Sequence, residues 1–144
     1  MASSVLNREK SRIGLAREIE PKDIMQGQIG DCYFLSSIAS VISFYPEIVS
    51  GMFLFGANQA RFYAVKLFID GEWQVICTDD RFPCQYGKPV YAKPHGSEIW
   101  VLLLEKCFAK VYGSYKAIDS GTPTEGFRAL SGAPAEFFST ENDP

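Results

Sequence analysis

The chain has 144 residues, 47% hydrophobic and 22% charged, which is enough for one compact domain with a core and too short for two ordinary ones. Its 14 basic and 17 acidic residues are mixed along the sequence and give a net charge of −3, so neither nucleic acid nor an anionic membrane is an expected partner. A single histidine, His95, excludes any mechanism that takes two imidazoles from this chain.

The cysteine spacing and the N-terminal composition bear on the compartment. The cysteines form no Cys-x-x-Cys pair and no zinc-type pattern, which favours free thiols at positions 32, 77, 84 and 107. The N-terminus lacks the apolar stretch of a secretory signal, and no window approaches the roughly 20 apolar residues of a membrane span. We therefore expect a cytoplasmic protein without a membrane span.

The chain is predicted to consist of one folded unit with two loose ends. Residues 1–18 have little apolar periodicity and are expected to form a flexible arm, with no core contribution before about Ile19. The folded unit is expected to span residues 19–139, and residues 140–144 to form a disordered acidic tail.

The first predicted helix begins directly after Asp31, which is a suitable N-cap residue, and so places Cys32 in its first turn. Apolar residues recur at helical spacing from Phe34 onward, and Pro46 ends the helix or begins the next turn.

A β-hairpin is predicted next. Residues 62–69 and 72–78 are rich in β-branched and aromatic side chains and flank Asp70-Gly71, a dipeptide typical of two-residue hairpin loops.

A second long helix is predicted to be capped by Ser97, to begin at Glu98 and to end at Gly113, and we expect it to be the most buried element. Thr124 is a candidate cap for a short third helix. Two helices packed together beside a hairpin give an α+β fold.

Cys32 stands where a nucleophile is physically reasonable, because the free N–H groups of a helix start make its surroundings electropositive. Gln26 precedes a loop, flexed by Gly27 and Gly30, that must fold back onto the helix start. Its side-chain amide and the Cys32 backbone N–H could then form an oxyanion hole. The alternative is that Cys32 is a small buried hydrophobe at the start of an apolar helix.

The segment from Gln26 to Leu35, QGQIGDCYFL, resembles the active-site cysteine motif of the calpains, calcium-dependent cysteine proteases with a papain-like core. Residues 71–83, 97–115 and 124–132 resemble further calpain segments in the same order, so the resemblance covers about residues 16–138. It implies that the chain folds as the N-terminal half of a papain-like cysteine protease core and acts on protein substrates.

The resemblance implies catalytic roles for particular residues. Cys32 corresponds to the nucleophile and Gln26 to the side-chain donor of the oxyanion hole, while Gly121 corresponds to backbone that lines the substrate cleft. Tyr33 departs from the tryptophan usual after the cysteine but keeps a large amphipathic ring.

The resemblance also implies a Ca²⁺ site. Its carboxylates correspond to Asp23 and Glu98, and its backbone carbonyls to Ala16 and Glu18. Oxygen ligands from distant segments suit Ca²⁺. Without the resemblance, Asp23 is interpreted as a turn residue and Glu98 as a first-turn charge on its helix.

The remaining members of a papain-like triad have no counterpart here. In such enzymes the histidine base and the orienting asparagine follow the cysteine by some 130 to 150 residues. His95 lies in Lys-Pro-His-Gly and is interpreted as a surface loop residue away from Cys32. We therefore expect no turnover by this chain alone.

Three hypotheses follow for the chain as a whole. It is part of a longer calpain-type protease, or a non-catalytic calpain-like protein that binds calcium or a partner, or a half that assembles in trans with a second catalytic subdomain. An isolated half is further expected to expose an apolar patch around Tyr33 and to self-associate.

Overall fold

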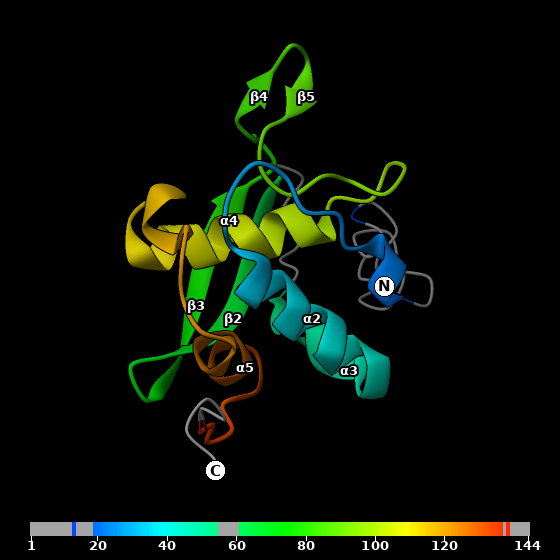
Figure 1. The fold of residues 1–144 in the computed structure, drawn as a ribbon. Coiled ribbons are helices and arrows are strands. Elements are labelled where there is room, and N and C mark those ends of the chain that lie inside the picture. The colour runs from blue at the N-terminus through cyan, green and yellow to red at the C-terminus, as the bar shows by residue number, and fades with distance from the viewer. Residues whose placement is uncertain (1–12, 14–18, 55–60, 137, 139–144) are drawn as a thin grey trace, which may run out of the picture.

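The computed structural model describes residues 13, 19–54, 61–136 and 138 (Figure 1). Its helices and strands follow one another as the 3₁₀ helix η1 (Pro21–Asp23), the helices α2 (Cys32–Phe44) and α3 (Pro46–Met52), the strands β1 (Phe53–Leu54), β2 (Phe62–Ile69), β3 (Glu72–Asp79), β4 (Cys84–Gln85) and β5 (Lys88–Pro89), the helix α4 (Trp100–Tyr112), the 3₁₀ helix η2 (Lys116–Ile118) and the helix α5 (Pro123–Ser131). This mixture of helices and small antiparallel sheets confirms the α+β class.

The main sheet is antiparallel, with the strand order β1-β2-β3. Ile69 pairs with Glu72 across the predicted hairpin turn, in which Asp70 and Gly71 have φ of 52° and 83°. Two successive positive φ angles suit the right-handed twist of the flanking strands, which explains the Asp-Gly sequence. Alternate residues of β2 are buried and form the inner face of the sheet: Tyr63, Val65, Leu67 and Ile69.

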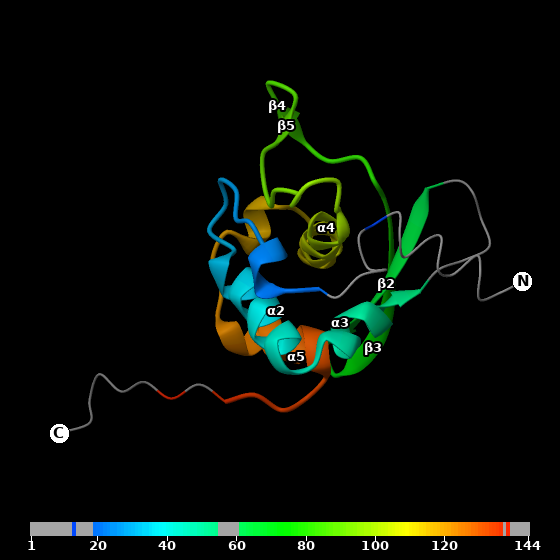
Figure 2. The ribbon, with the colours of Figure 1, turned by 90° about the vertical axis from the view of Figure 1, so that its right-hand side faces the viewer.

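The helices gather on one face of the β2–β3 pair, as the two views in Figures 1 and 2 show. α4 packs on β3, α5 packs on β2, and α2 packs on α5. Phe34 of α2 stacks on Phe108 of α4, with ring centroids 3.9 Å apart and an interplanar angle of 3°. The core therefore lies between the helices and the sheet, and the helix that begins at Cys32 is held directly against α4.

The predicted ends of α2 and α4 agree with the structure at three of four positions. α2 begins at Cys32, α2 ends at Phe44 before Pro46, and α4 ends at Gly113, whose φ is 98°. The predicted start of α4 is wrong, because Ile99 rather than Ser97 is the N-cap residue. Ser97 is instead part of a tight turn between His95 and Glu98 that holds it outside the helix.

The predicted cap of the third helix is also wrong. Thr122, not Thr124, is the N-cap of α5. The Thr122 side chain accepts a hydrogen bond from the backbone of Glu125, while the Glu125 carboxylate accepts one from the Thr122 N–H at 2.8 Å. This reciprocal capping box with Pro123 at the first helical position satisfies two otherwise unpaired donors.

The N-terminal segment contributes to the core at one described position. Ile13 is fully buried, and its carbonyl accepts a hydrogen bond from the Ile99 N–H at 3.2 Å. The expectation of no core contribution before Ile19 is therefore wrong. The remaining residues of the predicted arm and of the tail at 140–144 lie outside the described residues, so those boundaries stay predictions.

Two further expectations concern membranes and thiols. In the described ranges no single helix is both long and apolar enough to cross a membrane, and only α2 and α3 taken together, bent by 117°, reach that length and composition. All four cysteines are free thiols, as expected.

Candidate active site

Cys32 is exposed and is the first residue of α2. The backbone carbonyl of the N-cap residue Asp31 accepts hydrogen bonds from the N–H groups of Phe34 and Leu35, at 2.9 and 3.1 Å. The thiol thus stands at a regular helix N-terminus where solvent reaches it. The alternative interpretation of Cys32 as a buried hydrophobe is wrong, because its side chain is on the surface.

The loop before Cys32 is locked by close backbone contacts. The Gln28 N–H donates to the Val90 carbonyl at 3.1 Å, and the Gly30 N–H donates to Oδ1 of Asp119 at 2.7 Å. A Cβ on Gly27 would lie 1.8 Å from the carbonyl oxygen of Tyr91. Both glycines of the motif therefore serve close packing, since a Cβ on Gly30 would also lie 2.5 Å from a backbone oxygen.

Gln26 braces this loop from its other end. Its side-chain amide Nε2 donates to the Ile29 carbonyl at 2.9 Å, which leaves the second amide proton for another acceptor. Gln26 is exposed, and within the described part of the chain no hydrogen bond joins it to Cys32. The role of Gln26 as an oxyanion donor therefore stays a prediction.

Asp31 occupies the predicted N-cap position, but its side chain does not cap the helix. It is fully buried, and in the described structure neither carboxylate oxygen has a hydrogen-bond donor assigned to it. The neighbouring group is the carboxyl of Glu105 in α4. It can donate a hydrogen bond to Asp31 only when it is protonated, because an ionised carboxylate has no donor. Burial raises the pKa of Asp31, and the Glu105 contact opposes part of that rise.

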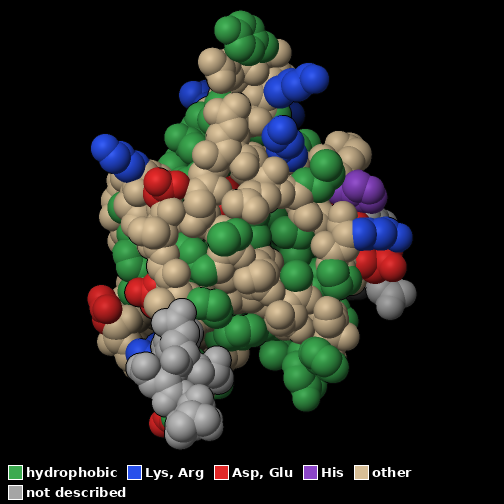
Figure 3. All heavy atoms as spheres, in the orientation of Figure 1, with side chains coloured by type: hydrophobic (Ala, Val, Ile, Leu, Met, Phe, Trp, Pro, Cys, Tyr) green, Lys and Arg blue, Asp and Glu red, His purple; other side chains and the backbone are tan. Residues whose placement is uncertain are grey.

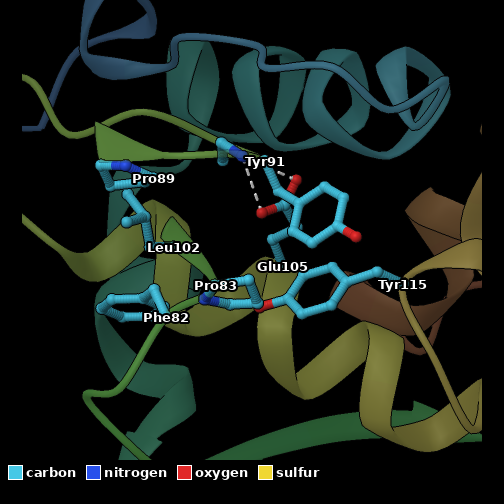
Figure 4. A pocket seen from close by; sticks show the side chains of 8 residues that line it. Phe82, Pro83, Pro89, Tyr91, Leu102, Glu105 and Tyr115 are labelled. Atoms are coloured by element: carbon cyan, nitrogen blue, oxygen red, sulfur yellow. Dashed lines mark hydrogen bonds between the residues drawn. The ribbon is translucent and has the colours of Figure 1, made fainter. Parts of the chain in front are cut away.

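Glu105 is held among aromatic rings (Figure 4). Its two carboxyl oxygens accept hydrogen bonds from the Ala92 N–H, at 3.1 and 2.9 Å. The stacked rings of Tyr91 and Tyr115, with centroids 4.0 Å apart, lie beside it in a pocket that has no room for a water molecule. Burial, and then the Asp31 carboxyl, raises the pKa of Glu105 to about 9, so Glu105 is protonated at neutral pH.

Gly121 lies beside Tyr33, the residue that follows Cys32. A Cβ on Gly121 would lie 2.5 Å from the Tyr33 ring, which also meets Phe108 edge-on at a centroid distance of 6.3 Å. Tyr33 is buried, and burial raises the pKa of its hydroxyl to about 12. The expectation that Tyr33 is exposed at the centre of an apolar patch is therefore wrong. Self-association of the chain stays a prediction.

The two carboxylates assigned to calcium do come together. Asp23 is 1% exposed, and ligand atoms of Asp23, His95 and Glu98 all lie within 4.8 Å of one another. Nδ1 of His95 is 3.1 Å from Oδ1 of Asp23. Figure 3 shows the histidine in purple at the edge of the molecule, next to acidic and basic side chains. Ala16 and Glu18 lie outside the described residues.

His95 is exposed in the segment before α4, in agreement with its interpretation as a surface loop residue, but it also has a partner that the sequence did not indicate. Its side chain is 45% exposed, but it contacts a buried carboxylate rather than solvent alone. The described partner of this imidazole is Asp23 and not Cys32, so nothing in the described residues supplies Cys32 with a base.

The comparison with protein families agrees with this arrangement. The family model described as "Calpain family cysteine protease" matches residues 5–144. The chain belongs to the calpain family of cysteine proteases. The exposed Cys32 therefore lies in the N-terminal half of a calpain protease core, as the motif predicted.

Individual calpains match most of this chain, but the match covers a small part of each relative. The catalytic subunit of calpain-2 from Gallus gallus is 37% identical over 127 residues, which is 85% of this chain and 18% of the relative. The calpain-2 catalytic subunit from Homo sapiens is 36% identical over the same length. The calpain-type cysteine protease DEK1 from Arabidopsis thaliana is 36% identical over 121 residues, or 83% of this chain and 6% of the relative.

Sequence reasoning missed the residues behind the calpain motif. Glu105 lies in the run Leu103-Leu104-Glu105-Lys106-Cys107, at a position that the helical period assigns to the buried face. A carboxyl on a buried face needs a partner, which was a usable signal. Asp119, which accepts from Gly30, follows no motif of its own and could not be found in this way.

Proposed function

We propose that this chain supplies the nucleophile side of a calpain-type cysteine endopeptidase site, with Cys32 as the attacking group. The observation that supports this most is the exposed thiol at the first residue of α2, behind a loop fixed by Gly27 and Gly30. A nucleophile at a rigid helix start is held in one orientation for attack.

In the proposed reaction the Cys32 sulfur attacks the peptide carbonyl carbon, and the carbonyl oxygen becomes an oxyanion. The Cys32 backbone N–H and the free amide proton of Gln26 would stabilise that charge. The C–N bond then breaks, and the leaving amine takes a proton from an imidazolium. Water hydrolyses the thioester, which returns the thiolate and the protonated imidazole.

The imidazole must come from outside the residues of this sequence. The one histidine of the chain, His95, contacts Asp23. Without an acid–base group beside Cys32, the reaction would lose the rate factor of about 10² to 10⁴ that general acid–base catalysis contributes. We therefore propose that Cys32 works only with a second subdomain that supplies a histidine and an asparagine across the cleft.

We further propose that Ca²⁺ binds at Asp23 and Glu98. The donor chemistry fits, because two carboxylates from separate chain segments converge within 4.8 Å and one of them is buried. When bound, the ion would cross-link η1 to the turn before α4. Its removal is then expected to loosen the loop that leads from η1 to Cys32.

Complementation tests the catalytic proposal. The chain is mixed with the second catalytic subdomain of a calpain-family relative, and cleavage of an unfolded protein substrate is measured with and without Ca²⁺. We expect cleavage that Cys32→Ser abolishes and that Cys84→Ser, which removes another exposed thiol, leaves unchanged. Cleavage that survives Cys32→Ser would overturn the assignment of the nucleophile.

A non-catalytic role is the second candidate, and the contact between His95 and Asp23 favours it, since the only imidazole belongs to the metal-binding region. In that case the chain binds Ca²⁺ or a partner without proteolysis. Two results together would support this role. The chain would cleave no substrate with any second subdomain, and it would bind Ca²⁺ in a way that Asp23→Asn and Glu98→Gln abolish.

A further inference from the structure

The cluster of Asp23, His95 and Glu98 contains a ligand that a calcium site does not use. Ca²⁺ takes six to eight oxygen ligands, whereas the side chain of His95 offers a nitrogen. An imidazole with two carboxylates is instead a donor set for borderline divalent ions, of which Zn²⁺ is the commonest. The donors of this cluster therefore suit two chemically different ions.

The separation of the His95 and Asp23 donor atoms suits a small tetrahedral ion. Zn²⁺ binds imidazole nitrogen and carboxylate oxygen at about 2.0 to 2.2 Å, so two neighbouring ligands of a tetrahedron lie roughly 3.4 Å apart. Nδ1 of His95 and Oδ1 of Asp23 are 3.1 Å apart. Only a few tenths of an ångström separate this pair from tetrahedral spacing.

The backbone holds these ligands in place from both sides. Oδ2 of Asp23 accepts a hydrogen bond from the Glu20 N–H at 2.9 Å, which turns Oδ1 toward His95. The Lys93 N–H donates to the Met25 carbonyl at 2.8 Å and so fastens the second segment to the first. Such outer hydrogen bonds orient metal ligands and strengthen binding.

A tight turn joins His95 to Glu98 and keeps their ligand atoms within 4.8 Å of each other. The Glu98 N–H donates to the His95 carbonyl at 3.2 Å, and Gly96 between them has a φ of 65°. The two carboxylates balance the charge of a divalent cation, and a neutral imidazole adds none. Among the described residues, three side-chain ligands from two segments therefore converge, one fewer than a tetrahedral site takes.

We propose that Asp23, His95 and Glu98 form a Zn²⁺ site, in which Zn²⁺ competes with Ca²⁺ for the two carboxylates and His95 selects the transition metal. The inference rests on the metal-binding part of the proposed function and deepens it. Because the ions share Asp23 and Glu98, bound Zn²⁺ excludes Ca²⁺ from the same chain, and the ratio of the two ions decides which one occupies it.

Direct binding measurements test the site. Zn²⁺ affinity is measured by competition with a coloured chelator and Ca²⁺ affinity by calorimetry, on the full chain carrying Cys32→Ser, Cys77→Ser and Cys84→Ser so that no exposed thiol binds zinc. Added to this background, His95→Gln replaces the nitrogen by an amide oxygen, a ligand that Ca²⁺ accepts. We expect Zn²⁺ affinity to fall at least about tenfold and Ca²⁺ affinity to change less than about threefold. Asp23→Asn should weaken both.

The single histidine allows a readout without any variant. In the nitrogen NMR spectrum of the labelled chain, Zn²⁺ should shift the Nδ1 resonance of His95, and Ca²⁺ should not produce the shift of a coordinated nitrogen. If Zn²⁺ affinity is the same in His95→Gln, or if Zn²⁺ does not shift the Nδ1 resonance, this inference is overturned, whether or not Ca²⁺ binds. If Zn²⁺ binds through His95 and Ca²⁺ does not bind, only the calcium proposal is overturned.

Discussion

The carboxyl groups of Asp31 and Glu105 are neighbours in the core, and Asp31 directly precedes Cys32; their exposed fractions are 0% and 1%. Two buried carboxylates so close together cannot both be charged at low cost, so the pair holds a proton at neutral pH. This shared proton joins the start of α2 to the middle of α4. We therefore expect the start of α2, where Cys32 lies, to respond to the protonation of this pair.

This pair predicts an unusual pH dependence of stability. The unfolded chain releases the Glu105 proton near the ordinary value of 4.5, whereas the folded chain holds it up to a pKa of about 9. Between these values the folded state binds more protons, so raising the pH favours unfolding. Urea denaturation at several pH values should show the free energy of unfolding falling from about pH 5 toward pH 9.

The matched variants for this prediction are Glu105→Gln and Glu105→Leu. The glutamine keeps an acceptor for the Ala92 N–H and can donate to Asp31, so stability at pH 6 should change by no more than about 1 kcal/mol and its fall toward pH 9 should flatten. The leucine leaves both groups unpaired, at about 1 to 3 kcal/mol each. A wild-type curve as flat as that of Glu105→Gln would contradict the shared proton.

The loop before Cys32 should not tolerate a side chain at Gly27. In Gly27→Ala the new Cβ would lie 1.8 Å from the Tyr91 carbonyl oxygen, so the loop must move, at a cost of about 1 to 3 kcal/mol. The rate at which iodoacetamide labels Cys32 should change as well, because this loop leads into α2. Gly51→Ala is the control: it has open space inside α3 and should stabilise by about 0.5 to 1 kcal/mol. Equal effects of the two changes would argue against a locked loop.

The stacked pair of Phe34 and Phe108 should carry much of the contact between α2 and α4. Phe108→Ala removes a fully buried ring and should cost about 3 to 5 kcal/mol, measured by thermal or urea unfolding. Phe44, at the far end of α2, is 78% exposed, so Phe44→Ala should stay within about 0.5 kcal/mol. A comparable loss in both variants would mean that α2 is not anchored through this stack.

Much of the fold could be predicted because it depends on short-range chemistry. Asp70-Gly71 specified the hairpin, and Gly113 ended α4, since each adopts a positive φ that its neighbours demand. The cap of α5 was missed although its signal is local. Thr122 has Pro123 after it and a glutamate three residues on, whereas Thr124 has Phe127 at that position. The capping box, rather than the nearest Thr, decides the start.

The candidate site was predictable only where one segment contains the whole signal. The cysteine motif is such a segment, and the helix start at Cys32 was predicted correctly from it. The inward turn of Asp31 and the contact of His95 with Asp23 depend on segments far apart in the sequence. Local patterns favour a side-chain cap at Asp31, which tertiary packing overrides, and they place His95 in a surface loop correctly without indicating its contact with Asp23.

The burial of Ile13 predicts that the N-terminal segment is part of the fold. Ile13→Ala should cost about 2 to 5 kcal/mol, because it empties a fully buried site next to the start of α4. Phe138→Ala, at a site 79% exposed near the other end of the chain, is the control and should change stability by less than about 0.5 kcal/mol. Urea unfolding measures both. The Ile13 carbonyl accepts a hydrogen bond from Ile99, the residue directly after Glu98, so Ile13→Ala should also weaken Zn²⁺ and Ca²⁺ binding. Unchanged stability would instead support the prediction that residues 1–18 form a flexible arm.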